Sequence, residues 1–170
     1  MLRLIKFVLD TKTYGLKLFP QMFEDSLKWN LVIYSDSDWA GDKENRRSIS
    51  GFIMFLCGVP IVWRSKQQTT VALSSSEAKF IAISDAVKEI LFVLQILSSV
   101  GIEVKKPVLV HLDNMGAIFM SENNSSGVRT RHIDTRYHFV GELVDEKIIE
   151  IVFVKMEENM ADGFTKNHKW

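Results

Sequence analysis

Apolar and polar residues alternate along this chain in blocks whose lengths and periods predict strands and helices. Short, continuous apolar runs of the kind that form buried strands occur at residues 31–35, 51–56, 59–63, 108–112 and 148–154. Cys57-Gly58 lies between the second and third runs and predicts a β-hairpin. A polar turn is predicted at residues 41–48, after the first run.

The clearest helical pattern lies between Ser74 and Gly101. Apolar residues recur there at spacings of three and four, which defines one helix face: Phe80, Ile83, Ala86, Val87, Ile90, Leu94 and Leu97. Ser74 and Glu77 have the spacing of a capping box, and Gly101 is a helix stop signal. We therefore predict a long amphipathic helix that packs on the strands.

The remaining elements are shorter. The pattern predicts helices at residues 2–9, 114–122, 133–144 and from about Asn159, a strand-like piece at 14–20, a linker at 21–29 and a basic loop at 127–132. The order of elements fits an α/β fold with a mixed five-stranded sheet flanked by helices. Residues 1–29 bury little by themselves, so we predict a connecting segment at 1–29 and one domain at 30–170.

Composition narrows the possible classes of protein. With 170 residues, 46% of them hydrophobic, the chain has the size of one domain with a substantial core. It has no apolar run of the roughly 20 residues that a membrane span needs, and we predict neither a membrane segment nor a signal peptide. The single cysteine, Cys57, is predicted to be a buried, reduced thiol in a cytoplasmic protein. We expect a monomer.

Four acidic residues carry the candidate chemistry. Asp36 and Asp113 follow two predicted strands, Glu77 lies in the first turn of the long helix, and Asp162 follows the last strand. Strand ends and helix starts in such a sheet converge on one edge. Carboxylate oxygens suit Mg²⁺ or Mn²⁺, and two ions of this kind serve phosphoryl transfer. Four converging carboxylates would also repel one another in the metal-free protein.

Each of these acids also has a structural interpretation. Asp36 fits a turn before Gly41, and Asp113 fits a cap for a helix that begins at Asn114. Glu77 is the back-bonding member of the capping box, and Asp162 lies three residues after Asn159, which is the same register.

Several motifs of this chain resemble the ribonuclease H domain of copia-type retrotransposon polyproteins. They occur in order between about residues 31 and 167: YSDSDWAGD at 34–42, SGF at 50–52, WRSK at 63–66, ALSSSEA at 72–78, DNMGAI at 113–118, RTRHIDTRYHF at 129–139 and ADGFTK at 161–166. Residues 1–29 resemble the segment that joins the reverse transcriptase to this domain.

The resemblance implies the ribonuclease H-like fold, with the first three strands antiparallel and the last two parallel to the first. It also implies Mg²⁺-dependent hydrolysis of the RNA strand of an RNA–DNA hybrid during reverse transcription, in a cytoplasmic retroelement particle. Partners would be the hybrid and the reverse transcriptase domain of the same polyprotein. Asp36 and Asp113 would be the central ligands of two metal ions, with Asp38 as the competitor for the first place. Glu77 would hold one ion and contact the RNA, and Asp162 would bind the second.

The chain departs from the family pattern at several positions. Residues 156–161 lack the histidine that many ribonucleases H place there. Lys79, Gly141 and Gly163 stand where the resemblance predicts an acid, an arginine and an aliphatic residue. We interpret the missing histidine as slower turnover and not as inactivity, and the other three departures as affecting stability more than chemistry.

Nucleic-acid binding must come from local basic clusters, because 21 basic and 21 acidic residues leave no net charge. The predicted contact residues are Asn114, Arg46, Arg47, Lys66, Arg129 and Arg131. We expect Trp39, Trp63 and Phe80 to be core residues. Two other functions fit the pattern: a catalytically inactive domain that tethers nucleic acid, and an integrase of the same fold. An acid that opens the first long helix after a three-stranded meander favours ribonuclease H over the integrase.

Overall fold

A computed structural model describes residues 2–15, 18, 28–114 and 131–166 of the chain. Its centre is a five-stranded sheet in the order β3-β2-β1-β4-β5. The strands are β1 (Leu31–Ser37), β2 (Ile49–Leu56), β3 (Val59–Gln67), β4 (Val108–Leu112) and β5 (Ile149–Phe153). Strands β1, β2 and β3 pair antiparallel, whereas β4 and β5 run parallel to β1. The predicted mixed five-stranded sheet and its strand directions are confirmed, and the structure adds the order of the strands.

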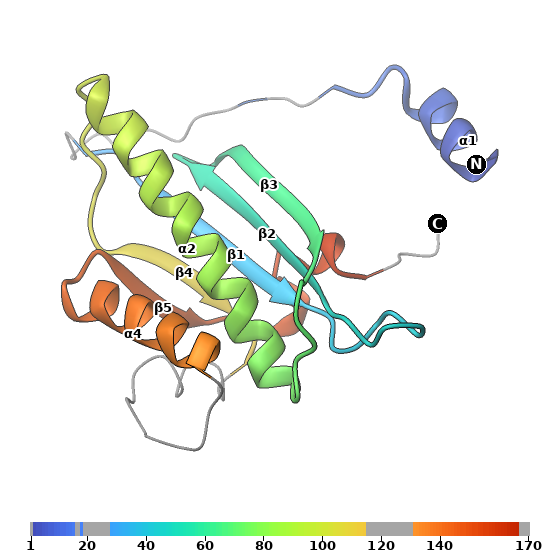
Figure 1. Ribbon diagram of the computed structural model, residues 1–170. Coiled ribbons are helices and arrows are strands. Elements are labelled where there is room, and N and C mark those ends of the chain that lie inside the picture. The colour runs from blue at the N-terminus through green and yellow to red at the C-terminus, as the bar shows by residue number, and fades with distance from the viewer. Residues whose placement is uncertain (1, 16–17, 19–27, 115–130, 167–170) are drawn as a thin grey trace.

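Within the described part of the chain, two helices cover the sheet. Helix α2 (Ser75–Ser99) packs against β1 and β2, and α4 (Arg131–Asp145) packs against β5 and α2 (Figure 1). The predicted apolar face of α2 is confirmed, because Phe80, Ile83 and Ile90 are fully buried in the core cluster. Phe80 also stacks on Tyr137 of α4, with ring centroids 3.8 Å apart. The two helices thereby form one layer over the sheet.

The ends of α2 follow the predicted signals. The Ser74 side chain accepts a hydrogen bond from the Glu77 amide, and Gly101 adopts φ 77°, a left-handed conformation that favours glycine. The β2–β3 hairpin turn is built similarly, with φ 49° at Cys57 and 79° at Gly58. Two left-handed residues are what a two-residue turn needs to match strand twist. Cys57 is a buried, free thiol, as predicted.

Residues 2–11 form the predicted N-terminal helix, α1 (Leu2–Thr11). Its apolar side chains at Ile5, Val8 and Leu9 are exposed, and none of them belongs to the core cluster. No strand forms at Tyr14, Gly15 or Leu18, and the rest of the strand-like piece lies outside the described residues. None of the described helices combines the length and apolarity that crossing a membrane requires.

The prediction of a helix from about Asn159 is wrong. Two short 3₁₀ turns, Met156–Glu158 and Asp162–Phe164, replace it. Asn159 does not cap a helix through Asp162; its side-chain oxygen accepts a hydrogen bond from the Ala161 amide at 3.0 Å instead. This Asx turn competes with helix initiation and keeps the segment compact. The predicted helix at 114–122 and most of the loop at 127–132 lie outside the described residues.

The prediction that Trp39 and Trp63 are core residues is also wrong, because each is 55% exposed. Trp63 lies on β3, an edge strand whose second half is exposed throughout. Trp39 lies beyond the end of β1, where its indole N–H donates to the Ala72 carbonyl at 3.2 Å. An aromatic ring can therefore be fixed at the surface by its polar edge without joining the core.

Candidate active site

The register of the parallel strands brings Asp36 and Asp113 to adjacent strand ends. Tyr34 of β1 pairs with His111 of β4, and the same offset carried two residues further leads to Asp36 and Asp113. Asp36 is 2% exposed, and the side chain of Asp113 is also 2% exposed. Two carboxylates thus lie almost out of water at the end of the sheet's central strand pair. Such a pair requires a compensating positive charge.

Lys79 supplies that charge. Its Nζ lies 3.2 Å from Asp36 Oδ1 and also forms an ion pair with Asp113 Oδ1. The Lys79 side chain is only 12% exposed, so this is a largely buried ionic triad. The sequence interpretation, which took the lysine at position 79 to affect stability more than chemistry, missed this contact.

A sequence signal for Lys79 existed. Lys79, Ile83 and Ala86 share one stripe of α2, and both apolar members are fully buried. A lysine that continues a core-facing stripe must find carboxylate partners within the fold. The acids predicted at the strand ends were the available partners.

Glu77 occupies the capping position that its structural interpretation predicted. Its Oε2 accepts a hydrogen bond from the Leu73 amide at 2.8 Å, while its own amide donates to Ser74 Oγ at 3.1 Å. Ser76 Oγ lies 3.4 Å from Asn114 Oδ1, so the start of α2 adjoins the end of β4. Glu77 therefore lies near the same end of the sheet, with its carboxylate engaged in the helix cap.

Asp162 reaches the site on the C-terminal 3₁₀ turn. Lys166, four residues later, forms an ion pair with its Oδ1. Thr165 Oγ1 donates a hydrogen bond to Asp36 Oδ2, which ties the same turn to the central pair. Ser65 Oγ of β3 donates to the Phe164 carbonyl at 2.6 Å. The turn is thus anchored at both β1 and β3.

Two further residues hold the C-terminal segment against the sheet. Asn159 Nδ2 donates to the Ser35 carbonyl at 3.1 Å, next to Asp36. Gly51 of β2 pairs with Asp36, and a Cβ at Gly51 would meet Phe164 Cβ at 2.7 Å and Thr165 Cγ2 at 2.8 Å. Glycine is required here because only a bare backbone lets the turn approach Asp36.

The pKa shifts show that the acids share one electrostatic neighbourhood. The hydrogen bond to Asp162 is the main cause that raises the pKa of Lys166, and the charges of Asp162, Asp36 and Asp113 add to it. Burial raises the pKa of Asp38, with a further rise from Asp36, against the lowering by its hydrogen bond from the Ile49 amide. The Asp38 carboxylate accepts a hydrogen bond from that amide. Asp36, and not Asp38, lies beside Asp113 in the register of β1 and β4.

The described residues contain no group of three or more acidic, histidine or cysteine side chains arranged to hold a metal ion. Around the central pair, three carboxylates (Asp36, Asp113 and Asp162) alternate with two ammonium groups (Lys79 and Lys166), so the cluster carries one net negative charge. The expected repulsion among four converging carboxylates took no account of these ammonium groups, and it stays a prediction. Two lysines lie among them.

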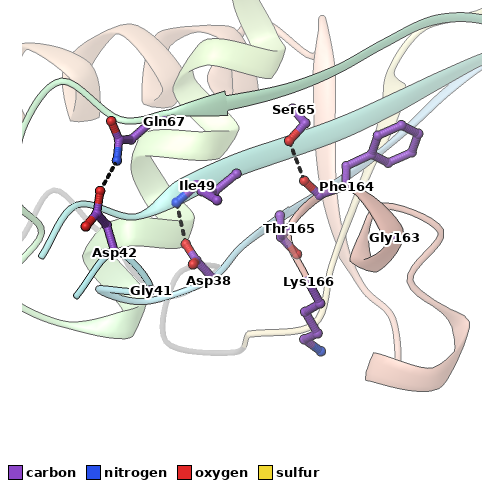
Figure 2. Close-up of a pocket in the computed structure, with 10 residues that line it drawn as sticks. All are labelled: Asp38, Gly41, Asp42, Ile49, Ser65, Gln67, Gly163, Phe164, Thr165 and Lys166. Atoms are coloured by element: carbon purple, nitrogen blue, oxygen red, sulfur yellow. Dashed lines mark hydrogen bonds between the residues drawn. The ribbon is translucent and has the colours of Figure 1, made fainter. Parts of the chain in front are cut away.

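A cavity of about 670 Å³ adjoins the site between the β1–β2 turn and the C-terminal segment (Figure 2). It is lined by Asp38, Gly41, Asp42, Ile49, Ser65, Gln67, Gly163, Phe164, Thr165 and Lys166. Figure 2 shows Asp38 turned toward Ile49 and Asp42 turned toward Gln67, whose Nε2 donates at 2.7 Å. Thr165 belongs to both the cavity wall and the Asp36 contact.

The predicted nucleic-acid contacts are only partly described. Arg46 and Arg47 are exposed in the turn after β1, and Lys66 pairs with Ser50, which pairs with Ser37. All three therefore lie at the same end of the sheet as Asp36. Arg64, beside Lys66, is paired with Glu89 at 2.9 Å. Arg129 and the side chain of Arg131 lie outside the described residues.

Comparison with known proteins identifies relatives along most of the chain. It is 40% identical over 133 residues, or 78% of its length, to the retrovirus-related Pol polyprotein from transposon TNT 1-94 of Nicotiana tabacum. It is 32% identical over 164 residues, or 96% of its length, to the Pol polyprotein from transposon RE1 of Arabidopsis thaliana. The chain spans only 10% and 11% of these polyproteins. No protein-family model matches it.

Among solved structures, LC11-RNase H1 in complex with an RNA/DNA hybrid has the same fold. The TM-score is 0.57 at 14% sequence identity, and the match covers 79% of this chain and 93% of that one.

Proposed function

The homologues of this chain are copia-type retrotransposon Pol polyproteins and its fold is that of ribonuclease H, and on this premise we propose that it hydrolyses the RNA strand of RNA–DNA hybrids. The observation that carries the proposal is the pair of buried carboxylates, Asp36 and Asp113, at adjacent ends of β1 and β4. The structural neighbour bound to an RNA/DNA hybrid supports the substrate class. The reaction would serve reverse transcription of a retrotransposon.

Divalent metal ions fit the chemistry of these donors. Asp36 and Asp113 both direct an oxygen at the Lys79 ammonium, so the two carboxylates already converge on a cation. Hard carboxylate oxygens are what Mg²⁺ and Mn²⁺ prefer. Asp36 and Asp113 would be the shared ligands, with Glu77 and Asp162 completing two sites. When bound, such ions activate water and neutralise the charge on a leaving oxygen.

The residues around the carboxylates have positioning roles in this proposal. The Thr165 hydroxyl fixes one oxygen of Asp36, and the Asn159 amide fixes the backbone of Ser35 beside it. These bonds hold the central carboxylate in one orientation, which a site built for in-line displacement requires. Asn114, which contacts Ser76 at the start of α2, lies next to Asp113 and would meet the ribose of the cleaved strand.

The hybrid would bind along the end of the sheet that carries Asp36. Arg46 and Arg47 are exposed there, and Lys66 lies two strands away on the same end. Phosphate contacts of this kind set affinity without selecting a sequence. We assign the N-terminal segment at 1–29 to the connection with the reverse transcriptase domain of the same polyprotein. The protein would act as a monomeric domain in a cytoplasmic retroelement particle.

The decisive experiment is a cleavage assay with a labelled RNA–DNA hybrid, with and without Mg²⁺ or Mn²⁺. The expected result is metal-dependent shortening of the RNA strand, while single-stranded RNA and the DNA strand remain intact. A folded protein that binds the hybrid but cuts no RNA at any metal concentration would contradict the proposal.

The position of the hybrid is tested by salt dependence. Replacing Arg46 and Arg47 together with glutamine should flatten the dependence of binding on salt, by roughly one unit of logarithmic slope for each phosphate that an arginine neutralises in the wild type. Lys105 and Lys106 are exposed just before the start of β4, at the opposite end of the sheet, and their double replacement is the matched control. Fluorescence anisotropy across a salt series measures both. Equal slopes in all three proteins would place the hybrid elsewhere.

A catalytically inactive domain that only binds or tethers nucleic acid is the second candidate. One observation favours it: Lys79, a cation of the chain itself, pairs with both central carboxylates. This alternative predicts hybrid binding that neither requires metal nor leads to cleavage, and the same assay separates the two.

A further inference from the structure

Lys79 occupies an unusual position for a lysine. It is the fifth residue of α2, one turn in from the positive end of the helix dipole, which disfavours a positive charge. Its side chain is 12% exposed, and the neighbouring Ala78 and Phe80 are fully buried. Both features oppose an ammonium group at this place. Its two ion pairs, with Asp36 and with Asp113, offset these unfavourable contributions.

We propose that the Lys79 ammonium is a built-in cation that competes with divalent metal for Asp36 and Asp113. In this arrangement one oxygen of each carboxylate is committed to Lys79, and the second oxygen of Asp36 is committed to Thr165. Metal can enter only when Lys79 leaves. Since this inference concerns metal binding, it rests on the metal dependence proposed above.

The charge balance of the cluster supports competition. Lys79 and Lys166 reduce three carboxylates to one net negative charge, whereas affinity for a hard cation rises with the number of uncompensated carboxylates. Lys166 differs from Lys79 because it pairs with Asp162 from an exposed position, with 45% of its side chain in solvent. It can move aside at low cost, so Lys79 is the group that controls access to the central pair.

The test compares two lysines of the same helix. Lys79→Met removes the ammonium and keeps an unbranched side chain of similar length. Lys88→Met is the matched control, because Lys88 is 56% exposed and pairs only at 3.6 Å with Asp85. Binding of Mn²⁺ is measured by electron paramagnetic resonance, and thermal melting is followed with and without Mg²⁺. Neither readout requires hydrolysis.

Lys79→Met is expected to lower the stability of the metal-free protein and to raise its affinity for metal. Without metal, Lys79→Met should melt below the wild type, because two buried carboxylates lose their counter-ion. With metal, it should bind Mn²⁺ at least about tenfold more tightly, since a positive charge beside the ion has been removed. Its melting temperature should then respond to Mg²⁺ at lower concentrations than the wild type does. Lys88→Met should match the wild type in both measurements.

A labelling experiment on the wild-type protein covers the case in which Lys79→Met does not fold. Acetic anhydride modifies accessible amines, and mass spectrometry gives the extent at each lysine. Lys79 should be protected without metal and become modified when Mg²⁺ is raised, while Lys88 should be modified equally in both conditions. Unchanged protection of Lys79 at Mg²⁺ concentrations that produce a full melting response would overturn the proposal, as would equal Mn²⁺ affinity of wild type and a folded Lys79→Met.

Failure of this inference is distinguishable from failure of the proposed function. If Lys79→Met binds metal more tightly but no variant cleaves a hybrid, competition stands and the hydrolase assignment fails. If the wild type cleaves hybrids and its metal affinity does not depend on Lys79, the hydrolase assignment stands and competition fails.

Discussion

The four candidate acids divide into two pairs that the fold positions by different means. Asp36 and Asp113 come at the ends of two paired parallel strands and are nearly inaccessible to solvent. Glu77 and Asp162 come on a helix cap and a 3₁₀ turn, and each is engaged with local groups, the Leu73 amide and Lys166. The strand-borne pair is fixed by sheet register, whereas the turn-borne pair depends on side-chain contacts. We therefore expect the two pairs to differ in how strongly they tolerate change.

The difference also explains where the lysines act. Two ionised carboxylates are costly to bury without a counter-charge, and for the central pair Lys79 supplies it. The outer acids keep solvent access, and the side chain of Asp162 is 23% exposed. Water screens such ion pairs and makes them weak. The site thus has a centre in which two carboxylates share one buried ammonium, and an edge in which one carboxylate pairs with a more exposed ammonium.

The largest effect is expected on the rate of hybrid cleavage when one of the two central carboxylates is replaced. Asp113→Asn should lower hybrid cleavage by several orders of magnitude and leave the protein folded, because the change is nearly isosteric but removes one anionic ligand. Asp162→Asn should lower it less, since that acid lies at the edge. Rates at saturating Mg²⁺ measure both, with Asp145→Asn, at the exposed end of α4, as the control. Equal losses at Asp113 and Asp162 would break the distinction between the pairs.

The next effect concerns the packing of the C-terminal turn, which carries Asp162, against β2 beside Asp36. Gly51→Ala should destabilise the protein by about 1–3 kcal/mol, because its Cβ would clash with Phe164 and Thr165. Urea denaturation measures the change in the free energy of unfolding, and Gly15→Ala is the matched control because nothing lies within 4 Å of its Cβ. We expect the Thr165–Asp36 hydrogen bond to break while the Lys79 ion pairs remain. Unchanged stability would mean that the C-terminal turn does not depend on close approach to β2.

A smaller effect is expected at the helix cap. Ser74→Ala should cost about 1 kcal/mol, because the Glu77 amide loses its acceptor. Ser75→Ala, one residue further into the exposed first turn, removes a hydroxyl without removing the cap and serves as control. Thermal melting compares the two. If Glu77 is held in place by this cap, Ser74→Ala should also weaken the response of the melting temperature to Mg²⁺, which Ser75→Ala should leave unchanged.

The smallest effect is expected in the turn after β1, which belongs to neither pair. Hydrogen bonds from the amides of Glu44 and Asn45 lower the pKa of Asp42 below 3.8. A folded-state pKa below the unfolded value stabilises the fold at pH above the unfolded value, and this contribution is lost as pH falls through the folded value. The stability advantage of wild type over Asp42→Asn should therefore shrink as pH falls below 3.8. An advantage that grows on acidification would contradict this assignment.

Much of the fold was determined by the sequence alone. The apolar runs, the helical periodicity of α2, its Ser74 and Gly101 boundaries and the Cys57-Gly58 turn were all predicted at or within a few residues of their observed positions. These features depend on local backbone preferences and on the need to bury one face, and both are readable from neighbouring residues. The same approach failed at Trp39 and Trp63, because exposure depends on which strand forms an edge.

The composition of the site was decided by tertiary structure. The sequence singled out Asp36 and Asp113 as residues that follow strands, but only parallel pairing of β1 with β4 brings them together. Lys79, Thr165 and Gly51 come from three different elements, and their contacts with Asp36 or with the C-terminal turn arise only once the sheet has formed. A buried charge is compensated by whatever the fold places within reach, whatever the separation along the chain. For that reason the acids could be predicted from the sequence, whereas their pairing with Lys79 was decided by the fold.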